Sequence, residues 1–480
     1  MTTFLLNDTV VVERDCDPAL TVLQYLRQRR RRTGTKEGCG SGDCGACTVA
    51  LGRVEQGRMY YETVSACLTP LSALQSKQLI TIEDLRQAGE LHPVQQAVVD
   101  LHASQCGFCT PGMVMSLFVL QKQSTGWDRQ QAEQALAGNL CRCTGYRPIM
   151  DAARQLCEYP IEDTFTRQEA HTVARLNALA RDIAEAPSDK AYSCFMPTSL
   201  EQLAACYLRY PQARLLAGGT DLMLDMAHSG SAHPPMIALE QVEALRDAYT
   251  DDNHIHLGAG LTITQCENWL YASLPAFARV LQRFASRQIR NRGTLGGNIA
   301  NASPIGDTPP MLLALDAELV LQRGTDLRTV PLHDFFLAYR KTALAPSEFI
   351  REILIPSGAL LDNFRAWKVS KRADDDISIV FGAFSLQIEQ GSIVQARVAF
   401  GGMDAVPRRA ERCERVLLNQ PWSRATVMAA SQVLEQDFTP LSDARASADY
   451  RMQLARNLLL RYFFCLQGED VAMEVTHYVA

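Results

Sequence analysis

Several features are absent from this chain, and each absence excludes a class of protein. No stretch of the 480 residues approaches the roughly 18 uninterrupted apolar residues of a membrane-spanning helix, so we expect no membrane span. The N-terminal segment MTTFLLNDTVVVERDCD lacks a basic start and a long apolar core, so we do not interpret it as a signal peptide. The net charge is only −6, which offers no case for nucleic acid or a membrane surface as a partner. We find no internal repeat that would indicate a solenoid.

Cysteine, in contrast, is abundant. Fifteen cysteines in a chain without an evident leader favour reduced thiols in a cytoplasm over a disulfide framework. Eight of them lie in the first 143 residues and form two sets of four. The remaining seven are scattered, and we interpret them as small buried hydrophobic side chains: Cys16, Cys157, Cys194, Cys206, Cys266, Cys413 and Cys465.

The first cysteine set lies in GCGSGDCGACTV and SACLTP and consists of Cys39, Cys44, Cys47 and Cys67. Its C-x4-C-x2-C spacing with a distant fourth cysteine is the plant-type pattern for a [2Fe–2S] cluster. Interleaved glycines would let the backbone wrap tightly and direct N–H groups at sulfur. Structural zinc is the alternative, but zinc sites usually pair two C-x2-4-C knuckles, which the isolated Cys67 fits poorly.

The second cysteine set lies in QCGFCTPG and NLCRCTGYRP and consists of Cys106, Cys109, Cys141 and Cys143. Taken alone, this C-x2-C and C-x-C arrangement could hold zinc. A C-x-C pair is uncommon in zinc knuckles, however, and prolines flank both loops. We expect the loops to lie between helices whose N-termini face an anionic cluster.

Patterning along the chain predicts an α+β protein of several domains, because 480 residues exceed one hydrophobic core. A hairpin and an amphipathic helix are expected in residues 1–82, and mostly helices in 83–160. Residues 161–190 are polar and alanine-rich, with little apolar patterning after Phe165, which suits a linker that is partly helical. Alternating strands, Gly-rich turns and helices follow in 191–360, and residues 361–480 predict a sheet packed on helices.

Two Gly-rich segments suggest a nucleotide cofactor. In LLAGGTDLML, a strand is expected to end before Gly218 and Gly219, with a helix beginning near Thr220 and Asp221. Such a turn lets backbone N–H groups approach a pyrophosphate, although a Gly-Gly pair is most often only a turn. The second segment, RNRGTLGGNIANASPIGDTPP, supplies small and polar residues suited to a ribityl-phosphate chain. Neither segment contains GxGxxG, so no Rossmann site is indicated.

The cysteine motifs closely resemble the paired [2Fe–2S] domains of the molybdenum hydroxylases, the xanthine dehydrogenase family, and the downstream segments resemble that family's flavin module. The order of domains resembles the small subunit of bacterial two-subunit members. One departure is Ser41, where the family often has Glu. The resemblance implies a ferredoxin-like β-grasp domain, a helical-bundle [2Fe–2S] domain, an FAD-binding domain of the vanillyl-alcohol-oxidase (PCMH) type and a C-terminal flavoprotein domain.

The resemblance also implies which residues contact FAD. Phe284 would lie near the isoalloxazine, although a core phenylalanine is the plainer interpretation, and Ile350 stands where the family often has Leu. The charged segment Lys371–Asp376 lies near the family's mobile flavin-side loop, although a solvated charge cluster is the safer interpretation. The full set of implied contacts is Leu215, Leu216, Ala217, Gly218, Gly219, Thr220, Asp221, Leu222, Phe284, Thr294, Gly296, Gly297, Asn298, Asp307, Ile350 and Lys368.

The activity implied by the resemblance is electron transfer. A molybdenum cofactor on a large partner subunit would oxidise xanthine or hypoxanthine to urate, and electrons would pass through the two clusters to FAD and NAD+. We expect an α2β2 heterotetramer, a cytoplasmic location, and no general acid or base on this chain. Because the chain ends at Ala480, we further expect that it cannot oxidise xanthine alone.

Three alternatives remain open from the sequence. The same architecture could serve another molybdenum hydroxylase that acts on aldehydes, nicotinate or another heteroaromatic compound. The chain could instead be a stand-alone NADH:acceptor iron–sulfur flavoprotein reductase. Least favoured is a zinc-binding scaffold without a redox role. The choice between NAD+ and oxygen as electron acceptor is also open.

Overall fold

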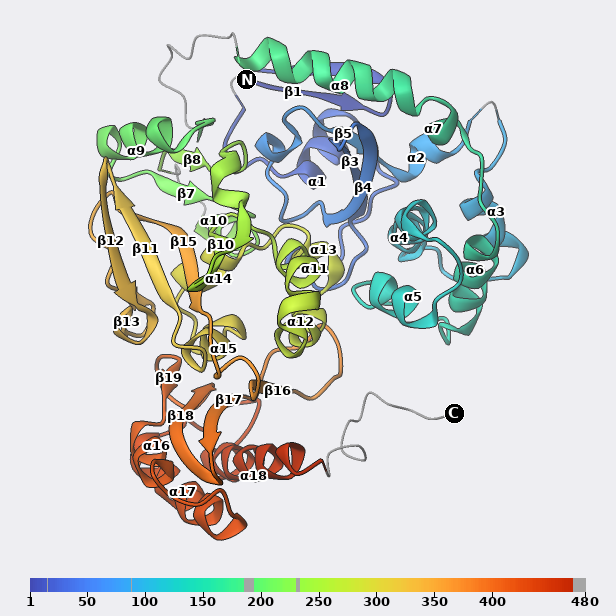
Figure 1. Ribbon diagram of the computed structural model, residues 1–480. Helices are drawn as coiled ribbons and strands as arrows, with labels where there is room; N and C mark the ends of the chain where they lie inside the picture. The colour runs from blue at the N-terminus through green and yellow to red at the C-terminus, as the bar shows by residue number, and fades with distance from the viewer. Residues whose placement is uncertain (15, 88, 185–193, 230–233, 469–480) are drawn as a thin grey trace. The chain divides into compact units, whose positions relative to one another are not determined.

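The computed structural model describes residues 1–468 except 15, 88, 185–193 and 230–233 (Figure 1). The chain forms two compact units that both mix helices and sheets, which confirms the expected α+β class. Unit 1 comprises Met1–Met196, Gln212–Glu240 and Ala285–Gly293, and unit 2 comprises Pro197–Pro211, Gln241–Phe284 and Thr294–Ala480. The region 191–360, expected as the FAD-binding domain, therefore contributes to both units.

A five-stranded sheet in the order β2-β1-β5-β3-β4 begins unit 1. The Asn-Asp turn forms the expected antiparallel hairpin, with Asn7 in the left-handed region at φ 55°. The expected amphipathic helix is a single turn, α1 (Val22–Gln24), that continues as a π-helical turn (Tyr25–Arg29) and buries Val22, Leu23 and Leu26. The strands are β1 (Thr2–Leu6), β2 (Thr9–Glu13), β3 (Thr48–Glu55), β4 (Arg58–Ser65) and β5 (Gln78–Ile80), followed by α2 (Ile82–Leu85).

Four helices form the next part of unit 1, as the sequence predicts for residues 83–160. Pro111 lies in the first turn of its helix, where a missing backbone N–H costs nothing. That helix, α4, is buried almost all round and forms the centre of this bundle. The helices are α3 (Pro93–Asp100), α4 (Thr110–Gln123), α5 (Arg129–Leu136) and α6 (Arg147–Glu158).

The segment expected as a linker is largely helical, with α7 (Thr164–Arg167) and α8 (Glu169–Ala184). The sequence interpretation missed its apolar patterning. Leu176 and Leu179 lie one turn apart and pack with Leu5, so α8 contacts strands β1, β3 and β4 (Figure 1). The remainder of the expected linker, residues 185–190, lies outside the described residues.

A small parallel sheet completes unit 1, in the order β6 (Cys194–Phe195), β8 (Met236–Ala238) and β7 (Arg214–Leu216). The helices α10 (Leu222–Ser229) and α13 (Arg287–Arg290) accompany it. Leu216, Met223 and Met236 share one hydrophobic core with the five-stranded sheet. Residues from the expected flavin region are therefore built into the same core as the ferredoxin-like domain.

Unit 2 contains an antiparallel five-stranded sheet, β12 (Asp326–Pro331), β11 (Glu318–Arg323), β15 (Phe349–Pro356), β10 (His254–Gly258) and β9 (Ala248–Thr250), in that order. Its core is shared with helices that follow β10 and precede β11. The remaining elements of this region are α9 (Leu200–Arg209), α11 (Ile263–Ser273), α12 (Pro275–Gln282), α14 (Leu295–Ala300), α15 (Thr308–Leu313), β13 (Phe336–Ala338) and β14 (Lys341–Thr342).

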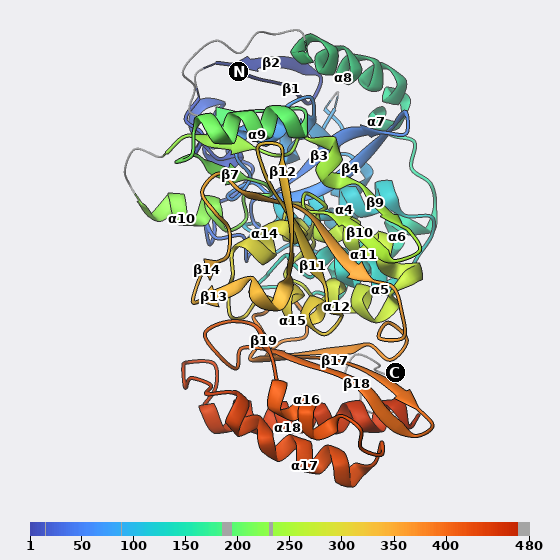
Figure 2. The same cartoon turned by 60° about the vertical axis from the view of Figure 1, so that its left-hand side comes forward.

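The C-terminal part of unit 2 is a sheet packed on helices, as predicted. Its strands are β16 (Arg365–Val369), β17 (Val380–Glu389), β18 (Ser392–Gly401) and β19 (Arg408–Arg409). Figure 2 shows α16 (Glu411–Leu417), α17 (Arg424–Asp437) and α18 (Ala448–Leu466) together on one face of β17 and β18. Among the helices of the described residues, none combines the length and apolarity that crossing a bilayer requires.

Candidate metal centres and flavin site

The first cysteine set is held by a loop that precedes β3 and by the end of β4. Cys47 and Cys67 are buried in the core of the ferredoxin-like sheet, whereas Cys39 is exposed. The thiol of Cys39 contacts those of Cys44 and Cys67, and hydrogen bonds from these two lower the pKa of Cys39. Cys47 contacts Cys67 in turn.

Backbone N–H groups of the glycine-rich loop point at these sulfur atoms. The N–H of Asp43 donates to Sγ of Cys39 at 3.3 Å, and that of Ser41 donates to the same sulfur at 3.4 Å. The serine that departs from the family pattern therefore still supplies a donor, because the donor is its backbone. Such N–H···S contacts stabilise thiolate and tune a bound metal.

The second cysteine set joins the N-terminus of α4 to the loop before α6. Cys109 contacts Cys141, and Cys106 contacts Cys143. Although burial raises it, hydrogen bonds from the side chain and backbone of Thr144 and from the backbone of Cys143 lower the pKa of Cys141 to about 7. Cys106 and Cys143 are exposed, so this set lies at the surface of the chain.

The arrangement of the sulfur atoms distinguishes an iron–sulfur cluster from a single zinc ion. Four thiolates about 2.3 Å from one zinc would lie within roughly 4 Å of one another. Among the described residues, no three of these cysteines bring their Sγ atoms within 4.8 Å of each other. In the second set the thiols form two separate contacting pairs, Cys109 with Cys141 and Cys106 with Cys143, which suits two irons bound by two cysteines each; in the first set the contacts run in series from Cys44 through Cys39 and Cys67 to Cys47. Both sets therefore fit [2Fe–2S] clusters.

A buried polar network joins the two cysteine sets, and the sequence interpretation missed it. Asn139, two positions before Cys141, donates to the carbonyl of Gly45 at 3.0 Å. Gln288 of α13 donates to Oδ1 of Asn139 at 3.0 Å and to Oγ1 of Thr48 at 3.2 Å. The N–H of Leu140 donates to the carbonyl of Cys44 at 3.0 Å. This last bond links a residue adjacent to one set directly to a ligand of the other.

Only glycine fits at position 45, because the backbone of the second cysteine set passes directly against it. Gly45 lies at φ +68°, and a Cβ there would stand 2.2 Å from the carbonyl oxygen of Gly138. No side chain can give way, because the neighbouring atom is backbone. The glycine between two ligands was visible in the sequence, but its contact Gly138 lies 93 positions away and could not be inferred from spacing.

A charged triad ties the ferredoxin-like sheet to the second half of unit 1. Glu240 follows β8 and accepts hydrogen bonds from Lys77 and from Nη1 of Arg292, the latter at 2.8 Å. Burial raises the pKa of the Glu240 carboxyl, but the charges of Arg292 and Lys77 outweigh this and lower it well below its ordinary value. The carboxylate is therefore ionised between two cations.

Unit 1 holds the first group of expected flavin residues, Leu215–Leu222. The strand β7 ends at Leu216 and α10 begins at Leu222, which confirms the expected strand–turn–helix. Gly219 has φ +82°, and a Cβ on Gly218 would stand 1.8 Å from the carbonyl oxygen of Arg292. The glycine at 218 therefore permits close approach of protein backbone, a packing role in addition to any cofactor contact.

Unit 2 holds the second group, and several of these residues form a buried polar cluster. Asp307 accepts from Nζ of Lys368 at 2.7 Å and from Oγ of Ser378 at 2.5 Å. Thr308 donates to Oδ1 of Asn298 at 2.6 Å. Ser378 was missed from the sequence because only the fold brings it to Asp307. The cluster offers fixed amide, hydroxyl and ammonium groups, which fits a polar cofactor.

The other expected flavin residues in unit 2 have structural surroundings of their own. Thr294 caps α14 by accepting from the N–H of Gly297 at 3.1 Å, and Gly296 lies inside that helix. Ile350 is buried in the core, and Phe284 is half-buried against it. Arg283 donates to the carbonyls of Lys368 and Ala373, which anchors the exposed segment Lys371–Asp376.

The seven other cysteines form no disulfide. Cys157, Cys266 and Cys413 are buried, in agreement with the interpretation as small hydrophobic side chains. The remaining four are only partly buried, so that interpretation does not hold fully for them: Cys16, Cys194, Cys206 and Cys465.

Four family models match successive parts of the chain. Residues 6–72 match a 2Fe-2S iron-sulfur cluster binding domain and residues 81–154 a [2Fe-2S] binding domain. Residues 190–358 match the FAD binding domain in molybdopterin dehydrogenase, and residues 365–466 match the CO dehydrogenase flavoprotein C-terminal domain.

Curated relatives include xanthine dehydrogenases. The chain is 32% identical to the xanthine dehydrogenase of Emericella nidulans over 96% of its own length and 38% of that protein. It is 30% identical to xanthine dehydrogenase 2 of Arabidopsis thaliana, over 96% of the chain and 39% of the relative. The chain thus spans well under half the length of these relatives.

Solved structures also resemble the chain. A carbon monoxide dehydrogenase from Hydrogenophaga pseudoflava has a TM-score of 0.52 at 28% identity, with 56% of this chain and 94% of that chain covered. Quinoline 2-oxidoreductase from Pseudomonas putida 86 has a TM-score of 0.53 at 26% identity, with 59% of this chain and 100% of that chain covered.

Proposed function

Because the four domains of this chain match those of the small iron–sulfur and FAD subunit of the molybdenum hydroxylase family, we propose that it carries electrons from a molybdenum-containing partner chain to NAD+. Its substrate through that partner would be a purine, xanthine or hypoxanthine, oxidised to urate. The curated relatives at 30–32% identity, which are xanthine dehydrogenases, support the purine assignment.

The proposal gives each cysteine set a [2Fe–2S] cluster and gives FAD to the residues around Leu215–Leu222, Thr294–Asn298 and Asp307. When bound, the clusters would exchange single electrons and FAD would combine them into two-electron reduction of NAD+. The chain's own residues hold these groups: loop N–H groups stabilise the thiolates, and Lys368 and Ser378 fix the Asp307 carboxylate. No general acid or base is required here.

The observation that carries the proposal is the link between the two cysteine sets. The hydrogen bond from the N–H of Leu140 to the carbonyl of Cys44 joins the residue before Cys141 to a ligand of the other set. The buried amides of Asn139 and Gln288 hold this link in place. Two clusters whose ligand loops are bonded to each other in this way would be arranged for electron exchange.

A partner subunit is supported by the surface around the second cysteine set. Phe108 and Tyr146 are 49% and 40% exposed, although both are large and apolar in character. They accompany the exposed thiols of Cys106 and Cys143. We propose that the molybdenum subunit covers this surface in an α2β2 assembly. Fifteen cysteines without a disulfide support a reducing, cytoplasmic location.

The deciding experiment is the visible spectrum of the purified native complex under anaerobic conditions. Addition of xanthine should bleach the iron–sulfur and flavin absorbance, and NAD+ should restore it. Bleaching by NADH but not by xanthine would retain the electron-transfer role and reject the purine. A colourless protein would reject the cofactors.

A second candidate is the same role in a hydroxylase for another substrate. The likeness to quinoline 2-oxidoreductase and carbon monoxide dehydrogenase supports this candidate, because solved chains of those proteins resemble 59% and 56% of this chain. Bleaching by a heteroaromatic compound or an aldehyde in place of xanthine would select it.

A further inference from the structure

A cluster of imidazole and carboxylate groups lies in unit 2 on the hairpin that joins β9 to β10. The sequence of this turn is Asp251-Asp252-Asn253-His254-Ile255-His256. His254 and His256 alternate along β10 with the buried residues Ile255 and Leu257, so their side chains share the outward face of the strand. None of them belongs to the cysteine sets or to the expected flavin contacts.

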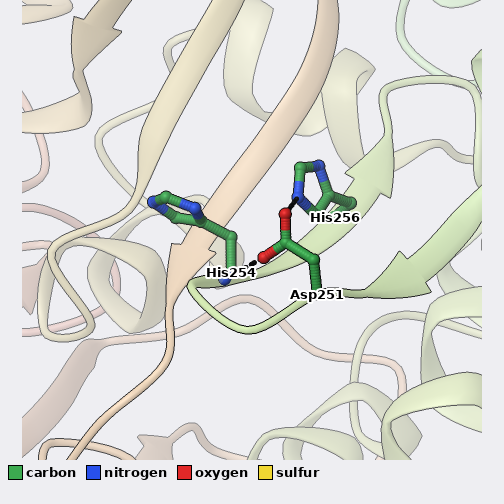
Figure 3. Close-up of side chains that lie close together, drawn as sticks. All are labelled: Asp251, His254 and His256. Atoms are coloured by element: carbon green, nitrogen blue, oxygen red, sulfur yellow. Dashed lines mark hydrogen bonds and ion pairs between the residues drawn. The ribbon is translucent and has the colours of Figure 1, made fainter.

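Three ligand atoms converge at this turn. One atom from each of Asp251, His254 and His256 lies within 4.8 Å of the other two, and no other such group of His, Cys, Asp or Glu occurs among the described residues. Figure 3 shows the Asp251 carboxylate between the two imidazole rings. Asp251 is 48% exposed and His256 12% exposed, so an ion from solution can reach them.

The carboxylate and one ring are held in position by other contacts. Oδ1 of Asp251 accepts from the backbone N–H groups of Asn253 at 2.8 Å and His254 at 2.7 Å, which directs Oδ2 toward His256. The ring of Tyr249 stacks on that of His256, with centroids 4.2 Å apart and planes 10° apart. The site is therefore preorganised on a rigid hairpin.

Both nitrogens of His256 face a carboxylate oxygen. Nδ1 lies 2.9 Å from Oε1 of Glu352 on β15, and Nε2 lies 3.0 Å from Oδ2 of Asp251. A neutral imidazole has one N–H, so it can donate to only one of the two. With the proton on Nδ1 toward Glu352, the lone pair of Nε2 and Oδ2 of Asp251 face each other as two acceptors. This is the carboxylate–histidine–metal arrangement of many metal sites.

The separation of these acceptors suits a shared ion. Two ligands about 2.0–2.1 Å from one ion, at angles between 90° and 110°, lie roughly 3 Å apart. The donor set of two imidazoles and one carboxylate favours zinc and similar first-row ions over magnesium or calcium. We propose that Asp251, His254 and His256 bind a divalent first-row transition ion, Zn²⁺ first among them, with Glu352 orienting His256.

This site is independent of the electron-transfer proposal. It would link the edge hairpin to β15 through Glu352, and binding to the folded state alone would stabilise unit 2. The three protein ligands leave coordination positions for water.

Zinc binding to the full-length protein, with its clusters and flavin retained, tests the proposal. The protein is dialysed against buffered Zn²⁺, and zinc and iron per chain are measured by mass spectrometry. The wild type should bind one more zinc than His254→Ala. Glu352→Gln should bind with about 10- to 100-fold lower affinity. The control His333→Ala removes an exposed histidine beside a single acid, Asp334, and should bind as the wild type does.

Unchanged iron and flavin content in each variant shows that the fold is retained, because the cysteine and flavin residues are untouched. Equal zinc in wild type and His254→Ala would overturn the proposal. Equal loss of zinc in His333→Ala would overturn it as well, since binding would then follow histidine number and not this geometry.

Discussion

The two cysteine sets differ in how the chain surrounds them. In the first set, Cys47 and Cys67 are 2% and 8% exposed and belong to the core of the ferredoxin-like sheet. In the second, Cys106 and Cys143 are exposed, and only Cys141 is buried. A glycine-rich loop wraps the first set, whereas a helix start and a short loop present the second at the surface.

This difference in exposure indicates different roles for the two sets in electron transfer. A centre at the second set, with two exposed ligands, would be the more accessible to another molecule, whereas at the first set only Cys39 is exposed. The network of Thr48, Asn139 and Gln288 holds the two environments together. Changes at the junction should therefore affect both sets, and changes elsewhere should affect one.

Gly45→Ala should have the largest effect because it breaks the junction itself. A Cβ at this position would meet the backbone of Gly138 at 2.2 Å and would also suffer the left-handed conformation. We expect loss of iron and acid-labile sulfide from both sets, measured per chain after purification.

Gly57→Ala is the matched control. Gly57 has a similar φ of +79°, but a Cβ there meets nothing within 4 Å. Only the conformational cost of about 1–2 kcal/mol should remain, with both clusters retained. Equal iron in the two variants would show that the Gly45–Gly138 contact does not hold the junction.

Glu240→Gln should have the next largest effect, a loss of stability where the charged triad joins the ferredoxin-like sheet to the second half of unit 1. The substitution leaves the buried cations Lys77 and Arg292 without their anion, a change that typically costs about 3–5 kcal/mol. The midpoint of urea unfolding should fall accordingly. Glu55→Gln removes an exposed partner of Arg53 and should lower the free energy of unfolding by less than about 1 kcal/mol. Similar shifts in both variants would refute the role of the triad.

The features of the two cysteine sets that depend on local spacing could be predicted from the sequence. Both cysteine sets, the first hairpin and the helices around the second set follow from ligand spacing, turn residues and periodicity. Each is specified within a few tens of residues, so the pattern is visible before folding.

The junction could not be predicted in the same way. Gln288 reaches Thr48 across 240 positions, and Asn139 reaches Gly45 across 94. A polar residue between apolar neighbours gives no sign of its partner at such distances. The packing of helix α8 on the sheet was missed for a different reason, since Leu176 and Leu179 are too few to stand out in an alanine-rich segment. His254 and His256 are only two positions apart on β10, so their pairing could have been predicted from the sequence, but the cysteine motifs gave a much stronger metal-binding signal.

Asp163→Asn should have a smaller effect, confined to the helical bundle of the second set. The carboxylate lies 2.8 Å from Nε2 of His92 and 2.6 Å from Nζ of Lys122. Burial raises the pKa of Asp163, but hydrogen bonds from His92 and Lys122 lower it below the ordinary value. Loss of these charged hydrogen bonds should cost about 2 kcal/mol at neutral pH.

The pH dependence follows from the direction of this shift. A carboxyl whose pKa is lower in the folded state stabilises the fold above its unfolded pKa, and this contribution is lost as the pH falls toward the folded pKa. The stability difference between wild type and Asp163→Asn should therefore be constant down to about pH 5 and shrink below about pH 4. Asp128→Asn, which alters the exposed cap of α5, should show little difference at any of these values. If the difference in unfolding free energy between wild type and Asp163→Asn grew as the pH fell, the pKa of Asp163 would not be lowered in the folded state.

The smallest perturbation leaves the sequence unchanged and compares the rates at which the two sets lose iron. In the isolated chain, an iron chelator should empty the second set before the first, because Cys106 and Cys143 are exposed and Cys47 and Cys67 are buried. Paramagnetic resonance of the reduced protein distinguishes the two clusters during the challenge. In the native complex the order should weaken or reverse, since a partner over Phe108 and Tyr146 would cover the exposed cysteines of the second set. The same order in the complex would mean that the partner binds elsewhere, and simultaneous loss in the isolated chain would mean that the junction, and not exposure, limits the release of iron.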